Sequence, residues 1–114
     1  MVEPRLPAHL EAAGLIRRTH AAGGFAAVLH KGERDAGPIL VIARENGTVP
    51  RLYERLPSLA GGRPWTLART AADGGEQEFE AYSRRRTAQD PDTWLIELDI
   101  PHAERLIGFS DERD

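Results

Sequence analysis

The sequence predicts one small α+β domain: an antiparallel or mixed sheet of about five strands with two helices packed mainly on one face. The chain has 114 residues, 40% of them hydrophobic and 29% charged, which suits a single folded domain over residues 1–114. Two helical patterns alternate with short aliphatic runs in the order helix, four strands, helix, strand. Because the runs are joined by short connections, antiparallel pairing is favoured.

The first predicted element is a helix over residues 6–22. Small and apolar residues, among them Ala12, Leu15 and Ile16, share one face at 100° per residue. The pair Gly23-Gly24 follows and supplies the usual C-terminal stop of a helix. Residues 1–5 are expected to be frayed.

Three strands are expected next, at residues 25–30, 38–45 and about 48–56. The run Ile39–Ala43 is aliphatic without alternation, which predicts a central strand covered on both faces. Asn46-Gly47 lies between apolar runs and predicts a tight hairpin turn, because both positions favour positive φ.

A fourth strand is predicted at residues 65–70 and a second helix at about 76–89. This helix opens with acids and closes with arginines, which complements the helix dipole at both ends. Its apolar stripe is thin and consists of Phe79 and Tyr82.

The last strand is predicted over residues 93–100, where apolar and acidic side chains alternate. Residues 101–109 are expected to form one helical turn against the core. Residues 110–114 are charged and are expected to be a frayed end.

Composition excludes several classes of function. The net charge is −3, from 15 basic and 18 acidic residues, so there is no general attraction to nucleic acid or anionic membranes. Without cysteine there is no disulfide, thiolate nucleophile or cysteine-bound metal. No apolar run reaches the length of a membrane span, and the N-terminus does not resemble a signal peptide. We therefore expect a soluble, cytoplasmic protein without a cofactor.

The segment "KGERDAGP", residues 31–38, is the first candidate site. Gly32 and Gly37 have the spacing of a phosphate-binding loop, but Pro38 stands where that motif requires lysine. A phosphate loop is therefore excluded, and a chain-turning role is favoured. An alternative is that His30, Glu33 and Asp35 bind a metal or another ligand from the 30–37 loop.

The run Arg84, Arg85 and Arg86 is a second candidate site, a possible contact for an anion. Successive residues of a helix point 100° apart, so the three side chains should fan around the helix. Structural roles are favoured, with Arg84 placed to pair with Glu80 at i,i+4.

Catalytic patterns are few. The sequence shows no Ser–His–Asp arrangement. Glu97 and Asp99 lie on one face of the last strand, about 7 Å apart, which is compatible with acid–base chemistry. Solubilising or edge-protecting carboxylates are the more common case.

Several segments resemble an uncharacterised bacterial family of small proteins, domain of unknown function 1491. They are "LIRR", "AAGGFAAVLHKGERDAGPILV", "PRLYERLPSL", "RPWTLA" and "DPDTWLIELD", and together they span roughly residues 8–99. The segments around Asp35-Ala36-Gly37 and Asp90-Pro91-Asp92 are the most specific. The resemblance implies a compact stand-alone bacterial protein and carries no assigned activity or site residues.

Three hypotheses for function remain open after the sequence. The favoured one is a non-enzymatic protein-interaction or regulatory module that binds a protein partner or forms a homodimer. The second is a small enzyme or ligand-binding protein that uses the 30–37 loop or the pair Glu97 and Asp99. The third, less favoured, is a nucleic-acid binder that uses an arginine face.

Overall fold

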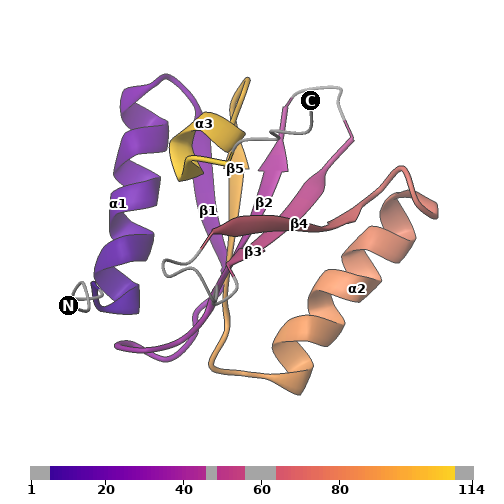
Figure 1. Cartoon of the computed structure of the whole chain (residues 1–114), viewed down its shortest axis with the longest axis horizontal. Helices are drawn as coiled ribbons and strands as arrows, with labels where there is room; N and C mark the ends of the chain where they lie inside the picture. The colour runs from indigo at the N-terminus through magenta and orange to yellow at the C-terminus, as the bar shows by residue number, and fades with distance from the viewer. Residues whose placement is uncertain (1–5, 46–48, 56–63, 110–114) are drawn as a thin grey trace.

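The computed structural model describes residues 6–45, 49–55 and 64–109, which form a mixed five-stranded sheet with helices on both faces (Figure 1). The strand order is β1-β5-β2-β3-β4. The elements are α1 (Ala8–Ala21), β1 (Phe25–His30), β2 (Ile39–Arg44), β3 (Arg51–Arg55), β4 (Trp65–Thr70), α2 (Gly75–Gln89), β5 (Trp94–Asp99) and the short α3 (Glu104–Ile107).

The α+β class, the five strands and the predicted order of elements are confirmed, and the sheet is mixed. The C-terminal helical turn is present as α3. The predicted Asn46-Gly47 turn and the frayed ends at 1–5 and 110–114 lie outside the described residues. No helix within the described ranges has the length and apolarity needed to cross a membrane.

The last strand of the chain occupies the inside of the sheet. β5 pairs with β1 on one side, antiparallel, and with β2 on the other side, parallel. Val41 on β2 lies opposite Ile96 on β5, and both side chains are fully buried. β5 lies between β1 and β2, so these two strands become part of one sheet only when β5 has been added.

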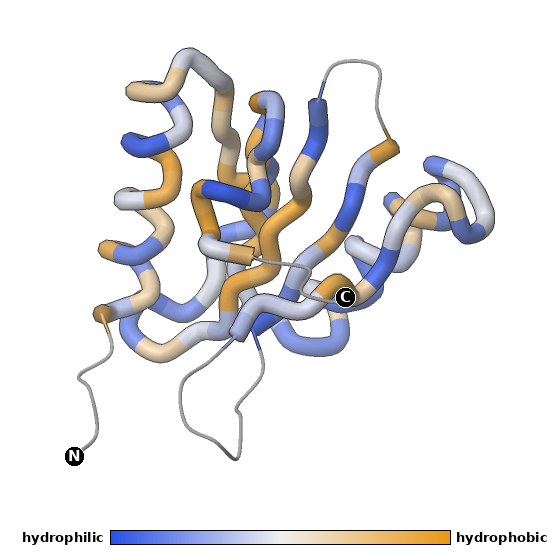
Figure 2. Tube along the Cα trace, turned by 45° about the horizontal axis from the view of Figure 1, so that its top comes forward, coloured by the Kyte–Doolittle hydropathy of each residue, from blue (hydrophilic) through white to orange (hydrophobic). Residues whose placement is uncertain are grey.

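The prediction that two helices pack mainly on one face is wrong. α1 and α3 cover one face, where Leu15 packs into a cluster with Val41 and Ile96. α2 covers the opposite face, where Phe79 packs into a second cluster that includes Ile42. The reason is the unbroken apolar run of β2, which is apolar on both faces and needs cover on both, as the hydropathy of the central strands shows (Figure 2).

A polar cluster fastens α3 to the sheet. The Glu104 carboxylate accepts hydrogen bonds from Arg51 Nε at 2.5 Å and from the Tyr53 hydroxyl at 2.7 Å. The Tyr53 ring also packs against Phe109, with ring centroids 4.7 Å apart. Burial and the hydrogen bond to Glu104 raise the pKa of Tyr53 to about 12. Although burial opposes it, the bonds from Arg51 and Tyr53 hold the pKa of Glu104 below its ordinary value.

The raised pKa of Tyr53 predicts a loss of stability at alkaline pH. Between pH 10 and about pH 12 the unfolded chain releases the Tyr53 proton while the folded chain retains it, so unfolding becomes easier as pH rises. The expected loss in the free energy of unfolding is about 2 to 3 kcal/mol. Urea denaturation at several pH values measures it. The variant Tyr53→Phe should have a flatter profile over this range, and equal slopes in both proteins would contradict the assignment.

Candidate functional site

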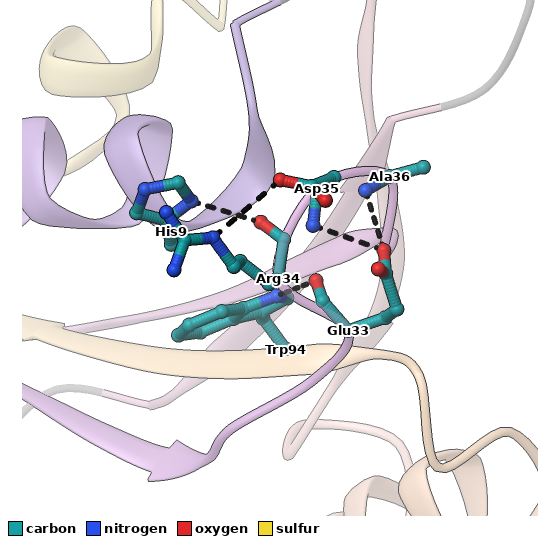
Figure 3. A network of polar contacts seen from close by, with 6 residues as sticks. All are labelled: His9, Glu33, Arg34, Asp35, Ala36 and Trp94. Carbon is teal, nitrogen blue, oxygen red and sulfur yellow. Dashed lines mark hydrogen bonds and ion pairs between the residues drawn. The ribbon is translucent and has the colours of Figure 1, made fainter.

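The 31–38 loop is held in place by its own polar groups (Figure 3). The Glu33 carboxylate accepts the backbone N–H of Asp35 at 3.0 Å and that of Ala36 at 2.6 Å. The Glu33 carbonyl accepts the indole N–H of Trp94 at 2.8 Å. Glu33 thus organises the turn and connects it to the start of β5.

The same loop caps the N-terminus of α1, which begins after Pro7 with no side-chain cap. The carbonyls of Asp35 and Arg34 accept the N–H groups of Ala8 and His9, each at 2.9 Å. These N–H groups belong to the first turn of the helix, where backbone N–H groups have no acceptors within the helix itself. The loop therefore turns the chain and also supplies the acceptors that α1 lacks.

The three proposed ligands of this loop are engaged in separate contacts. Glu33 binds its own loop, while Asp35 is exposed and lies 3.6 Å from Arg34. A ring nitrogen of His30 is 2.8 Å from the carbonyl of Thr93. Within the described residues, no group of three His, Asp or Glu side chains is arranged to hold a metal ion. The geometry thus gives no support to a metal site made of these residues.

The two glycines of the loop are required by the close approach of another backbone. A Cβ on Gly32 or Gly37 would clash with the carbonyl oxygen of Asp92, in the turn before β5. The same carbonyl accepts the N–H of Glu33 at 2.9 Å. The two segments that are most specific in the family resemblance therefore pack directly against each other.

The surroundings of Gly37 in the loop and Gly14 in α1 predict opposite effects when each glycine is replaced by alanine. Gly37→Ala should lower the free energy of unfolding by about 1 to 3 kcal/mol, because backbone atoms of Asp92 and Glu33 surround the new methyl group. Gly14→Ala, inside α1, meets only the flexible end of Arg18 and should raise it by about 0.5 to 1 kcal/mol. Urea denaturation of both variants tests this, and two changes of the same sign would contradict it.

The three consecutive arginines of α2 point to different surroundings. Arg86 is half-buried and donates to Glu54 at 2.9 Å and to the Tyr82 hydroxyl at 3.0 Å, and the bond to Glu54 raises its pKa. Arg85 lies 5.9 Å from the Tyr82 ring. Arg84 is exposed, and within the described part of the chain it forms no ion pair with Glu80. The run does not present one anion-binding surface.

The strand carboxylates Glu97 and Asp99 are both half-buried. Glu97 accepts a hydrogen bond from Arg44 Nε at 3.2 Å, and Arg44 also donates to Glu76 at 3.2 Å. Burial lowers the pKa of Arg44, but the hydrogen bonds to Glu76 and Glu97 outweigh it and the pKa is raised. Glu97 is therefore part of an ion-pair network that links β2, β5 and α2.

A surface that the sequence did not predict lies along the edge strand β1. Phe25 is 75% exposed, Leu29 52% and Val28 40%, although all three are large apolar residues. Phe25 and Ala27 pair with Asp99 and Glu97, so they lie on the face of the sheet that α2 covers elsewhere. Within the described chain, the core cluster under α2 includes residues of the other strands and none of β1. The described residues therefore leave this apolar face of β1 exposed.

A groove of about 330 Å³ separates this strand from α2. Its floor and walls come from β1, β2, β5 and α2, so the bare strand and the groove are continuous. We call the two together the β1 surface: Phe25, Ala27 and Leu29 with the groove lined by His30, Ile42, Arg44, Phe79, Glu80, Ser83, Arg84, Thr87, Leu95 and Glu97.

The sequence carried a signal for this surface, but an ambiguous one. The run "FAAVLH" is apolar without alternation, as is the central strand β2. Such a run indicates a strand with two apolar faces and does not show whether both are covered. The position of β1 at the edge of the sheet, beyond the reach of α2, decides the matter.

Comparison with known proteins gives a consistent family. A family model described as "Protein of unknown function (DUF1491)" matches residues 6–108. The chain is similar to the crystal structure of a DUF1491 family protein from Caulobacter crescentus CB15, with 30% identity, a TM-score of 0.80 and coverage of 92% of this chain and 97% of that one.

Two structures determined in solution are also similar. One, from A. tumefaciens, has 29% identity and a TM-score of 0.77, with 97% of this chain and 99% of that chain covered. The other is an NMR structure of a DUF1491 family protein from Caulobacter crescentus CB15, with 28% identity, a TM-score of 0.80 and coverage of 97% and 100%. No curated protein matches this sequence.

Proposed function

We propose that this chain, which belongs to the DUF1491 family, is a non-enzymatic protein-interaction or regulatory module of the bacterial cytoplasm. Its partner binds at the β1 surface, through the edge of β1 and the groove beside it. One observation carries this proposal: two large apolar side chains, Phe25 and Leu29, stand exposed on one face of an edge strand, and Leu29 lines the adjacent groove. The bacterial relatives and the cysteine-free sequence favour the location.

Exposed apolar residues are common singly, but a row of them along a strand edge is a typical interaction site. A partner segment that pairs with β1 gains main-chain hydrogen bonds, and its alternate side chains face the groove. Leu29 lines that groove together with Phe79 and Leu95, which supply an apolar wall. Affinity and specificity would then come from different parts of one surface.

The opposite edge of the sheet is less suited to this role. Both edge strands carry a register irregularity, β4 in its pairing with β3 and β1 in its pairing with β5 between Val28 and His30, so irregular pairing does not distinguish the two edges. Arg69 on β4 lies over the Tyr82 ring at 4.9 Å and 3.9 Å from Glu78. Charge on an edge strand discourages the addition of another strand, and β4 carries Arg69 whereas β1 has no Asp, Glu, Lys or Arg.

The titratable groups favour a structural over a catalytic reading. The groups with shifted pKa values lie in contacts that join elements, such as Arg51 with Glu104 and Arg86 with Glu54. A catalytic pair would instead meet in a cleft with a free position for substrate. No observation favours the enzyme or the nucleic-acid alternative specifically.

The test is capture of a partner by the protein purified gently from its own host. We expect the double variant Phe25→Lys/Leu29→Lys to reduce the amount of captured complex at least tenfold in native mass spectrometry. The reason is that two contacts that lose water on binding become charged. The matched control is Leu6→Lys/Leu10→Lys, which places the same two charges at leucines that are 59% and 49% exposed.

Both proteins should keep the free energy of unfolding of the wild type within about 0.5 kcal/mol, since the substituted residues are exposed. Equal capture by the double variant and the control would refute the β1 surface as the site of interaction.

A further inference from the structure

We propose that the partner of β1 is a second copy of this chain, with the two β1 strands paired antiparallel across a two-fold axis at Ala27. The inference rests on the proposed function, because it names the occupant of the same surface. The pairing would join two five-stranded sheets into one of ten strands. The support comes from the outward backbone groups, the register, the charges and the area of β1.

The first support is the direction of the backbone groups. The N–H of Ala26 donates to His20 Nε2 at 3.3 Å, so it points away from β5 and toward the open edge. Alternation along a strand then directs the N–H of Val28 to the same edge. β1 thus offers two outward residues, spaced as one repeat of an antiparallel ladder requires.

The second support is the register. A two-fold axis at Ala27 sets Ala26 opposite Val28 of the second copy, so the outward groups of the regular part of β1, residues 25–28, pair. The same axis brings Phe25 of each copy near Leu29 of the other, where the irregularity between Val28 and His30 adds one residue to β1. An axis at Ala26 or at Val28 would place neither apolar pair together. Only the axis at Ala27 matches both the backbone and the large side chains.

The residue on the axis also fits. Ala27 would face Ala27 of the second copy in a non-hydrogen-bonded pair, where Cα atoms are about 4.5 Å apart. A methyl group is small enough for that spacing. Phe25, Ala27 and Leu29 lie on one face, so the two copies would form a continuous apolar stripe that leads into each groove.

The third support is the charge distribution. Residues 25–30 contain no Asp, Glu, Lys or Arg, so no like charges meet across the axis. The nearest basic side chain, Lys31, would fall opposite Gly23 of the second copy. The paired strands themselves therefore bring no like charges together.

The area sets the expected strength. Phe25 is 75% exposed and offers about 150 Å² for burial, and Leu29 and Val28 add less. The sum over two copies stays below the roughly 1,600 Å² of a standard stable interface. We therefore expect a weak, reversible dimer, with a dissociation constant of about 10 to 500 µM.

His20 has a specific part in this interaction. In the free chain its Nε2 atom accepts a hydrogen bond from the N–H of Ala26, so His20 competes with a pairing strand for this donor. His20→Ala removes the competitor and should lower the dissociation constant several-fold. A contact that used only the apolar face of β1 would not respond to this change.

Cross-linking tests the register directly. The sequence has no cysteine, so a single introduced cysteine is a unique reporter. We expect Ala27→Cys to form a disulfide-linked dimer quickly under mild oxidation, because the axis brings the two thiols together. Phe25→Cys and Leu29→Cys should each cross-link poorly alone and efficiently when mixed. Leu10→Cys, exposed on α1, is the control for random collision.

Sedimentation equilibrium up to about 1 mM protein gives the second readout. Val28→Pro removes the outward N–H without removing a bond to β5, and should raise the dissociation constant at least tenfold. A dimer that shows no preferred cross-link at Ala27, or that Val28→Pro leaves intact, overturns the register. A strict monomer overturns the self-pairing.

The two proposals fail in different ways. If the chain is monomeric but captures another protein in a manner that depends on Phe25 and Leu29, the self-pairing is refuted and the interaction module stands. If neither dimerisation nor capture depends on these residues, both are refuted.

Discussion

The structure depends on the insertion of β5 between β1 and β2. This strand comes last in the sheet-forming part of the chain, yet it is one of the two most deeply buried strands. Because β5 runs parallel to β2, the chain must cross the sheet before it enters, and α2 makes that crossing. The position of α2, the docking of the 31–38 loop on the turn before β5, and the return of α3 over the sheet all follow from this insertion.

Polar side chains fasten the elements around that centre. Arg55 pairs with Glu11 of α1 and lies 4.6 Å from the Trp65 ring, so it connects the first helix to β3 and β4. Arg51 connects β3 to α3 through its ion pair with Glu104. Arginine suits these positions, because its planar fork can bind a carboxylate while its flat face packs against an aromatic ring.

The bare face of β1 follows from the same architecture. α2 reaches over β2, β3 and β5, where Phe79 fills the second core, and its amphipathic stripe is too thin to extend further. β1 therefore keeps a strand edge and an apolar face that the described residues leave exposed. An edge of this kind favours strand pairing, which is why the β1 surface carries both proposals.

The sequence by itself determined the local structure of this protein. Glycine pairs, apolar periodicity and the unbroken run of β2 placed the helices and strands, because these signals act over a few residues. The apolar run of β2 already implied that both faces of the sheet are covered, and the prediction of helices mainly on one face overlooked this. Only the tertiary structure decided the strand order, the opposite placement of α1 and α2, and the exposure of Phe25 and Leu29. These depend on contacts between residues far apart in the chain, such as Val28 with Ile96, and no local pattern encodes which of two equally apolar strands lies at the edge.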